Sequence, residues 1–460
     1  MPIEGGIVSW TEGVNRELSK VGLVKYDILG VTALSMLSEM EALTGVQANE
    51  PWDADSEPVF DLFCKADLQG IFQFSGSDGI VRLTKEVQPR SLADLSAINA
   101  LYRPGPLDSG MAWEYPKAKL QPRLVHPDVD VILKDSYGII IYQEQVMQIV
   151  ALMTGGSLSD ADDARKIISK GKVGDPVWQG KMRKLEAHFK TEGYKHFAKQ
   201  IVDMLWSEIV TFGRYGFNKS HSTAYSLLAY RMAWFKVYYP GAFYTALLNN
   251  DAEKAETWAY DAAVHGITIM KPHINTSGVA WVWDEAASAI FAPLSSIKFF
   301  GEDGAQAIVD WREQHGEFNT FKDIAKVPKR VLNIRAKKLM YYAEAFRGIG
   351  GDVKDIIPEF DSLPILKSIE AQRESMGFIL PNREILDFLK RSEVDGRIAG
   401  FVTEIEKRNK GKGDYYVVKL SPSGVFWTRE CDKIAKIKEG DLISVRMGKV
   451  GATEFKRARL

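Results

Sequence analysis

Cysteine and long apolar runs are scarce in this sequence. Only Cys64 and Cys431 are present among 460 residues, too few and too far apart for a disulfide framework or a zinc knuckle, which fits a reducing compartment. No stretch reaches the roughly 20 uncharged apolar residues that a membrane helix needs, and charged residues interrupt the first thirty positions, where a signal peptide would be apolar. We therefore expect a cytoplasmic protein with no membrane partner.

The sequence also lacks an excess of charge of either sign and the short motifs of several common enzyme classes. It has 59 Lys and Arg against 60 Asp and Glu, so a nucleic-acid partner would have to be bound by local basic patches. There is no phosphate-loop, HExxH or GxSxG motif, and the seven histidines are scattered. With 45% hydrophobic and 26% charged residues, the composition excludes disordered and collagen-like chains.

Hydrophobic periodicity predicts an α+β protein of several domains. Residues 22–30 form a short apolar run between glycines and predict a buried strand, whereas residues 61–250 have a mostly helical pattern. The longest helix is expected at 222–239, before Pro240. From residue 396 to residue 460 the pattern changes to several short strands, which favours a small β-barrel of the OB type.

Asp27 is the first residue that could carry chemistry. It lies in the centre of the apolar run at 22–30, where an ionised carboxylate is costly unless it is paired or bound to a metal. Because side chains alternate along a strand, Lys25 lies on the same face. The local sequence alone favours a Lys25–Asp27 ion pair and leaves a metal ligand as the alternative.

Three further segments offer cations to a phosphate. Arg103 precedes a Pro-Gly-Pro turn that could hold it rigidly, although a helix-ending turn with a solvated arginine is equally compatible. On a predicted helix at 164–172, Arg165 shares a face with Ser169, and Lys166 and Lys170 lie on a neighbouring face; the alternative is a solvated charged face.

The third segment is the start of the long helix, with the residues Asn218, Lys219, Ser220 and His221. Free backbone N–H groups and the helix dipole favour an anion there, although an ordinary cap formed by Ser220 or Ser222 is the simpler interpretation. Residues 161–225 contain 12 Lys and Arg against 7 Asp and Glu, so a phosphate-facing surface is plausible in this stretch.

Two later segments add candidate DNA contacts. In the basic C-terminal stretch, aromatic residues accompany a turn that carries Lys407, Arg408, Lys410 and Lys412, a combination that suits single-stranded nucleic acid. Part of those aromatic residues would instead form the barrel core. Lys298 belongs to a turn at 297–305 that could be a hairpin gripping a DNA phosphate, or a plain turn.

Taken together and in order, five runs resemble the C-family replicative DNA polymerases, that is, the alpha subunit of bacterial DNA polymerase III. They are GLVKYDILG at 22–30, GIFQF at 70–74, LYRPGPL at 101–107, YGIIIYQEQVM at 137–147 and YGFNKSHS at 215–222. The resemblance implies a palm remnant at 1–32, mostly helical fingers at 33–250, a helix-hairpin-helix-like duplex-binding region at 251–350, a linker and helix at 351–391 and an OB-fold at 392–460.

The resemblance also implies roles for the candidate residues. Asp27 matches the third metal-binding carboxylate of the palm and Lys25 the lysine of that strand. The basic and polar residues match fingers motifs that face the incoming deoxynucleotide and the primer-template, namely Arg103, Arg165, Lys166, Lys170, Asn218, Lys219, Ser220 and His221. Two Mg²⁺ ions would activate the primer 3′-OH and steady the pyrophosphate.

Departures from the family pattern limit what the chain could do alone. The PDxDxD-like run that supplies the other two metal-binding aspartates occurs nowhere in the 460 residues, and Asp53 and Asp55 lie downstream of Asp27 and cannot replace it. The hairpin glycine expected near Phe299 is missing, and 357–360 is a poor match to a sliding-clamp peptide, so a clamp partner stays open.

These departures predict the C-terminal half of a split phage or bacterial polymerase, active only with a second chain that carries the rest of the palm and the thumb. The alternatives are a non-catalytic DNA-binding relic of the same family and a piece of a longer protein.

Overall fold

The computed structural model describes most of the chain. The described residues are 2–3, 6–7, 30–47, 55–170, 176–212, 216–364, 368–394, 397–409, 414–421, 424–428, 434–435, 437–438, 441–448 and 451–458. Of the predicted strand at 22–30, only Gly30 is among the described residues. Lys25 and Asp27 therefore lie outside them. Lys410 and Lys412 also lie outside the described residues.

Two short antiparallel strands, β1 (Pro2–Ile3) and β2 (Gly6–Ile7), which the sequence did not predict, precede a long run of helices. The helices within 61–250 confirm the predicted helical pattern. The run consists of α2 (Thr32–Thr44), α3 (Glu57–Cys64), α4 (Asp78–Val87), α5 (Leu92–Leu101), α6 (Pro104–Asp108), α7 (Met111–Leu120), α8 (Pro127–Leu133), η2 (Lys134–Ser136), α9 (Gln143–Thr154), α10 (Leu158–Lys170), α11 (Pro176–Gly193), α12 (Lys199–Phe212), α13 (Lys219–Tyr238) and α14 (Pro240–Asn250). Among the described residues, no helix is long and apolar enough to cross a membrane.

The 20-residue helix α13 is the longest described helix, and it begins earlier than expected. Its N-cap is Asn218, whose side chain accepts a hydrogen bond from the backbone N–H of His221, so the expectation of a Ser220 or Ser222 cap is wrong. An asparagine caps as well as a serine does, and Ser222 is fully buried instead. The helix ends before Pro240, which is the first residue of α14 and suits that position because it needs no N–H donor there.

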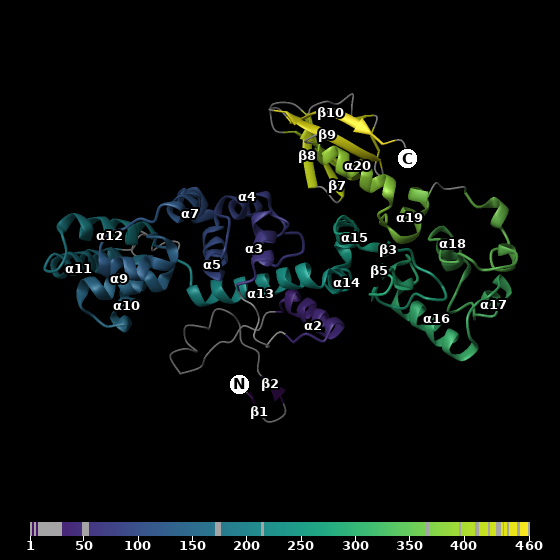
Figure 1. The fold of residues 1–460 in the computed structure, drawn as a ribbon, viewed down its shortest axis with the longest axis horizontal. Helices are drawn as coiled ribbons and strands as arrows, with labels where there is room; N and C mark the ends of the chain where they lie inside the picture. Colours follow the sequence, from purple (N-terminus) through teal and green to yellow (C-terminus); the bar gives the residue numbers. More distant parts are fainter. Residues whose placement is uncertain are drawn as a thin grey trace.

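Two separate hydrophobic cores support the helices before residue 250. The larger one includes residues of α2 to α5, α13 and α14 and continues into the later helices as far as Leu380. The smaller one is formed within α8 to α12 by residues such as Ile149, Phe189 and Trp206. In Figure 1, α13 extends between the group α9–α12 and α14, so it connects the two parts of the helical region.

The following segment combines a small sheet with helices. Its elements are η3 (Ala252–Lys254), α15 (Ala255–Val264), β3 (Thr268–Met270), β4 (Val282–Asp284), β5 (Ala289–Phe291), η4 (Leu294–Ser296), α16 (Gly301–His315), α17 (Phe321–Ala325), α18 (Ile334–Tyr342), η5 (Val353–Asp355), η6 (Phe360–Ser362), α19 (Ser368–Met376) and α20 (Arg383–Val394). The strand β5 pairs in parallel with β3 and antiparallel with β4. Leu363, which precedes Pro364, has an extended backbone with a ψ of 138°, as a residue before a proline prefers.

The C-terminal stretch forms an antiparallel five-stranded sheet in the order β10-β9-β6-β7-β8. Its strands are β6 (Ile398–Asn409), β7 (Asp414–Ser421), β8 (Gly424–Thr428), β9 (Leu442–Gly448) and β10 (Gly451–Arg457). Small apolar side chains such as Val402, Val418 and Val445 form its core. Among the described residues, no ladder joins β8 to β10, so the strands are confirmed while a closed barrel stays a prediction.

Candidate nucleic-acid interface

The N-terminus of α13 is held against the start of α9. Residues Tyr142 and Phe217 form a parallel bridge, and the backbone N–H of Gln143 donates to the carbonyl oxygen of Phe217 over 2.9 Å. The side-chain amide of Gln143 donates to the carbonyl oxygen of Gly216, also over 2.9 Å. Two of the runs that carried the family resemblance, 137–147 and 215–222, are therefore neighbours in space.

The anion position at this helix end is taken by Glu144. Its carboxylate accepts hydrogen bonds from the backbone N–H of Lys219, over 3.1 and 3.0 Å to the two oxygens, and from the side-chain amide of Asn218 over 3.0 Å. The expectation that these backbone N–H groups are free for a phosphate is therefore wrong for Lys219. A carboxylate accepts hydrogen bonds from backbone N–H groups that have no partner within the helix, and the positive end of the helix dipole stabilises its charge.

The side chain of Lys219 also lies at this helix end. Its ammonium group is 2.9 Å from a carboxylate oxygen of Asp135 and 5.6 Å from the centre of the Tyr142 ring, and its side chain is 43% exposed. Ser220 and His221 are exposed on the first turn of the helix. The side chains of this turn can therefore meet a ligand that approaches from solvent.

A row of side chains in edge-to-face and tilted contact starts at Arg103 and continues along the first turns of α13. The guanidinium carbon of Arg103 lies 4.3 Å from the centre of the Phe217 ring. Ring centres are 5.4 Å apart between Phe217 and His221, 4.2 Å between His221 and Tyr225, and 5.1 Å between Tyr225 and Phe72. None of these five side chains is fully buried, so the row, which we call the aromatic row, is partly accessible from solvent. This row was not predicted from the sequence, although residues 217, 221 and 225 follow one another at a helical spacing of four.

The position of Arg103 follows from the Pro-Gly-Pro segment. Arg103 is the N-cap of the short helix α6, with proline at its first position, so the expected turn is in fact a helix start. Its Nε donates to the carbonyl oxygen of Ala100 over 2.7 Å, and burial lowers the pKa of its guanidinium group. The arginine is therefore fixed at the end of the aromatic row.

The basic residues of α10 form ion pairs within their own helix. Arg165 lies 2.8 Å from Asp162, and Lys166 lies 2.8 Å from Asp162 and 3.0 Å from Asp163. Lys170 lies over the ring of Trp178 at 4.8 Å. The helix packs on α9 and α11.

Hydrogen bonds between small polar side chains join α5 to α13, and we call this contact the polar seam. The Ser96 hydroxyl donates to that of Ser222 over 2.9 Å, and the Tyr142 hydroxyl donates to Ser96 over the same distance. The Asn99 amide donates to Ser226 over 2.7 Å. Burial raises the pKa of Tyr142 to about 12, so its hydroxyl stays a donor at neutral pH. The seam fixes the rotation of α13, and with it the direction of the aromatic row.

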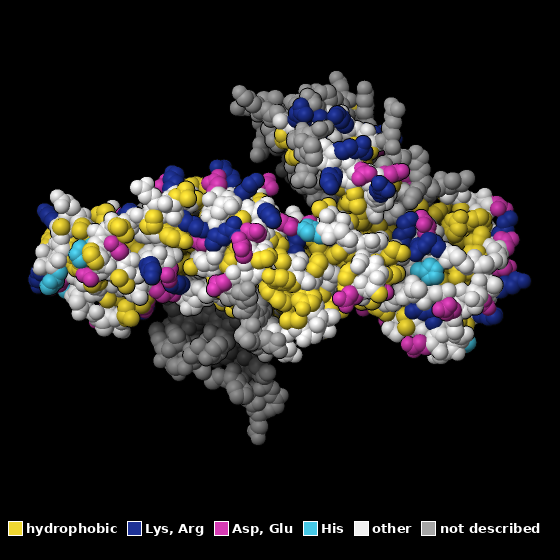
Figure 2. Space-filling view, viewed as in Figure 1, with side chains coloured by type: hydrophobic (Ala, Val, Ile, Leu, Met, Phe, Trp, Pro, Cys, Tyr) yellow, Lys and Arg dark blue, Asp and Glu magenta, His cyan; other side chains and the backbone are white. Residues whose placement is uncertain are grey.

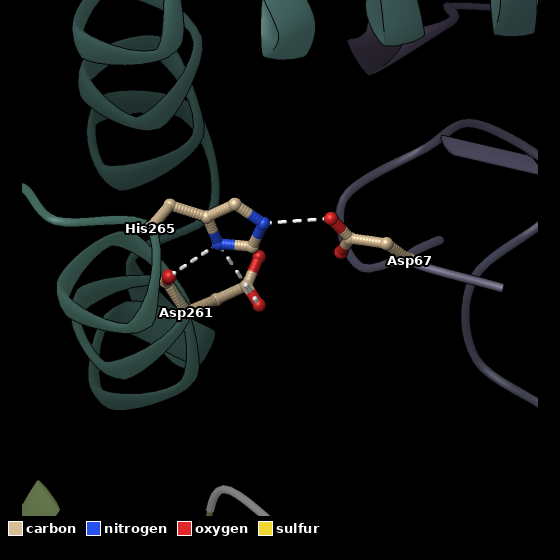
Figure 3. A group of neighbouring side chains, drawn as sticks. All are labelled: Asp67, Asp261 and His265. Carbon is tan, nitrogen blue, oxygen red and sulfur yellow. Dashed lines mark hydrogen bonds and ion pairs between the residues drawn. The ribbon is translucent and has the colours of Figure 1, made fainter. Parts of the chain in front are cut away.

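A partly buried ionic group lies at the other end of α13, and Figure 3 shows its two carboxylates and its imidazole. The Lys236 ammonium group is 2.8 Å from Asp67 and 3.0 Å from Asp261, and His265 Nε2 is 2.6 Å from the Asp67 carboxylate. The two carboxylates and the imidazole could hold a metal ion by their mutual distances. They do not suit Mg²⁺, which prefers oxygen ligands, and Lys236 already supplies the positive charge. We interpret the group as an ion-pair network.

Lys298, Lys407 and Arg408 are predicted DNA contacts that lie after residue 250. Lys298 is half-buried, and its amine donates to the carbonyl oxygen of Arg373 over 2.7 Å. Lys407 is exposed on β6, where it pairs in register with Tyr416 of β7, and Arg408 pairs in register with Tyr415. DNA binding by these residues stays a prediction.

Comparison with known proteins identifies two regions of the chain. A family model of the bacterial DNA polymerase III alpha subunit finger domain matches residues 32–196, and a helix-hairpin-helix model matches residues 266–356. The chain is 33% identical over 393 residues to the DNA polymerase III subunit alpha of Staphylococcus epidermidis, which covers 83% of this chain and 36% of that protein. It is 32% identical over 372 residues to the corresponding protein of Staphylococcus aureus, which covers 78% of this chain and 34% of that protein. The chain thus spans about a third of the length of these curated relatives.

Proposed function

We propose that the chain, a member of the C-family replicative DNA polymerases by its finger-domain match at 32–196, acts as the fingers and DNA-binding part of a DNA-directed DNA polymerase. Its ligands would be primer-template DNA and deoxynucleoside triphosphates. The carboxylates and the thumb that this sequence does not contain would be supplied by a second polypeptide. The domain limits given above and a cytoplasmic location are part of the same proposal.

The observation that carries the proposal is the aromatic row with a cation at its end. Single-stranded nucleic acid is bound by charge for its backbone and by π-faces for its bases, and base stacking on one aromatic side chain contributes roughly 1–3 kcal/mol. Arg103 would supply the charge at one end, and the partly exposed rings of Phe217, His221 and Tyr225 would supply the stacking surface. Lys219 lies beside the same helix end and would meet the triphosphate.

The catalytic part of the proposal concerns Asp27. A relationship to DNA polymerases implies a divalent metal ion such as Mg²⁺, which activates the primer 3′-OH and stabilises the leaving pyrophosphate. Asp27 would be one ligand, with Lys25 beside it and the remaining carboxylates from the second polypeptide. Arg165, Lys166 and Lys170 would neutralise phosphate charge after exchanging their present partners for it.

Primer extension tests this function directly. The purified chain should not extend a labelled primer with Mg²⁺ and deoxynucleotides, whereas a mixture with a polypeptide that carries the missing palm and thumb should do so. In the mixture, Asp27→Asn should abolish extension with little change in DNA binding, since the substitution removes mainly the charge that a metal needs. Asp53→Asn serves as the matched control and should retain extension. Full extension by the Asp27→Asn mixture, or by the single chain unaided, would contradict the two-chain mechanism.

A further inference from the structure

The loop that leads into α16 places one aromatic ring in solvent. Residues 297–300 form a tight turn in which the backbone N–H of Phe300 donates to the carbonyl oxygen of Ile297 over 3.1 Å. Ile297 and Phe300 are buried, whereas Phe299 between them is 70% exposed. The turn therefore fixes two side chains in the core and presents the third outward.

Phe299 is held in an unfavourable backbone conformation. Its φ of 60° lies in the left-handed region, which is unfavourable for a residue with a Cβ and costs glycine almost nothing. An exposed ring recovers little of this cost by burial. A glycine would fit this turn without strain, and strained positions occupied by other residues are common where a side chain acts on a ligand.

The base of the turn is rigid. The backbone N–H of Lys298 donates to the carbonyl oxygen of Ser375 over 2.7 Å. The side-chain amine of Lys298 donates to the carbonyl oxygen of Arg373, also over 2.7 Å. On the other side, Gly304 lies so close to Phe300 that a Cβ there would be 2.9 Å from the ring. The direction of the Phe299 ring is therefore set by contacts on both sides of the turn.

A cation from a second helix covers one face of this ring. The guanidinium carbon of Arg335, in the first turn of α18, lies 3.5 Å from the centre of the Phe299 ring, and Arg335 is exposed. Such a pair is a cation–π contact. The exposed residues Lys329 and Arg330 precede the same helix and add positive charge. An apolar ring with cations around it matches side chains that wedge between base pairs in the minor groove and kink the duplex.

We infer that Phe299 and Arg335 form a wedge that enters the minor groove of double-stranded DNA and partly unstacks one base step. The inference rests on the proposed DNA-binding function and adds to it a local distortion of the duplex. Arg335 holds the ring in place and contacts the groove, and the strained turn prevents the ring from folding back onto the protein.

Duplexes that carry 2-aminopurine at successive positions test the wedge, because the fluorescence of this base rises when it is unstacked. The full chain should bind them, as followed by anisotropy of an end label, and should raise the fluorescence at one or two positions. Phe299→Gly should remove the rise and weaken binding roughly tenfold, the loss of about one stacking contact. Phe299→Trp should retain the rise.

Two controls separate the wedge from other effects. Phe299→Gly should unfold at a temperature at least as high as the unchanged chain does, because glycine relieves the strain, so lost binding would not reflect misfolding. Ser288→Gly, at another exposed residue with a φ of 47°, should leave both readouts unchanged. A rise that persists in Phe299→Gly, or binding by the unchanged chain without any rise, overturns the wedge alone. Failure of the unchanged chain to bind duplex DNA overturns both the wedge and the proposed DNA binding.

Discussion

At the scale of single residues, Glu144 decides what the start of α13 can bind. Its carboxylate takes the hydrogen bonds that an incoming phosphate would otherwise receive from Asn218 and Lys219. A nucleotide must therefore displace this carboxylate or bind through side-chain cations such as Arg103. The sequence displays both segments, but they lie 75 residues apart, and only tertiary pairing shows that one caps the other.

His265 makes the stability of the fold depend on pH. Its hydrogen bond to Asp67 raises the pKa of His265 above 6.5, so its stabilising contribution is complete below pH 6.5 and is lost as pH rises through the raised pKa. For Asp67, burial alone would raise the pKa, but the hydrogen bond to His265 and the charge of Lys236 outweigh it and lower the pKa from 3.8 to about 2. The contribution of Asp67 is therefore present above pH 3.8 and is lost as pH falls toward 2.

We predict that His265→Gln lowers the melting temperature most at pH 6 and progressively less as pH rises, since the unchanged histidine then loses its proton too. Thermal unfolding followed by circular dichroism over a pH series measures the difference. His315→Gln, at an exposed histidine of α16, should give a small difference that does not vary in this way. A constant deficit for His265→Gln at every pH would show that the imidazole acts only by packing.

At the scale of elements, the contact between α5 and α13 depends on small polar side chains. Ser222 has no exposed surface, and its hydroxyl donates to the carbonyl oxygen of Ser96 and accepts from the Ser96 hydroxyl. A larger apolar residue would both overfill the seam and leave these partners unsatisfied. The seam should therefore be intolerant of apolar substitutions that an exposed position on the same helix accepts.

Ser222→Leu should lower the free energy of unfolding by at least about 2 kcal/mol, combining roughly 1–3 kcal/mol for overpacking with the cost of a lost buried hydrogen bond. Urea denaturation measures this change. Ala224→Leu, at an exposed position two residues later, should change it by less than about 0.5 kcal/mol. Equal effects of the two substitutions would mean that the seam is loosely packed.

At this scale, the elements that could be predicted from the sequence are those whose signals are local. The helical pattern of 61–250 and the end of α13 before Pro240 were predictable because periodicity and proline act within a few residues. Strand β10 was missed, since its sequence GATEFKR carries three charges and alternates poorly. The Phe72 end of the aromatic row was also missed, because its contact with Tyr225 spans 153 positions of sequence and depends on the packing of α13. The metal-site residue Asp27 stays a prediction from the family resemblance.

At the scale of the whole molecule, the positive charge of the helical region is distributed rather than gathered. In Figure 2, the Lys and Arg side chains over the helices on the face in view alternate with Asp and Glu, in agreement with the ion pairs within α10. The local excess of basic residues in 161–225 is thus partly neutralised by near neighbours. When DNA binds, these lysine and arginine side chains must leave their carboxylate partners and contact phosphates instead. We expect such binding to weaken strongly as the salt concentration rises.

We predict that the triple substitution Lys166→Ala, Lys170→Ala and Lys219→Ala weakens binding to primer-template DNA and flattens its dependence on salt. Each phosphate contact contributes about 0.9 to the slope of the logarithm of the binding constant against the logarithm of salt concentration, so removing three contacts should reduce the slope by roughly 2 to 3. Fluorescence anisotropy over a salt series measures it. A second triple variant with alanine at the exposed residues Lys85, Lys117 and Lys195 removes the same net charge and should change the slope far less. If both variants behave alike, net charge alone governs binding and the three lysines are ordinary solvated surface; if neither changes the slope, DNA is bound elsewhere, and the helix-hairpin-helix region and the C-terminal sheet become the segments to test.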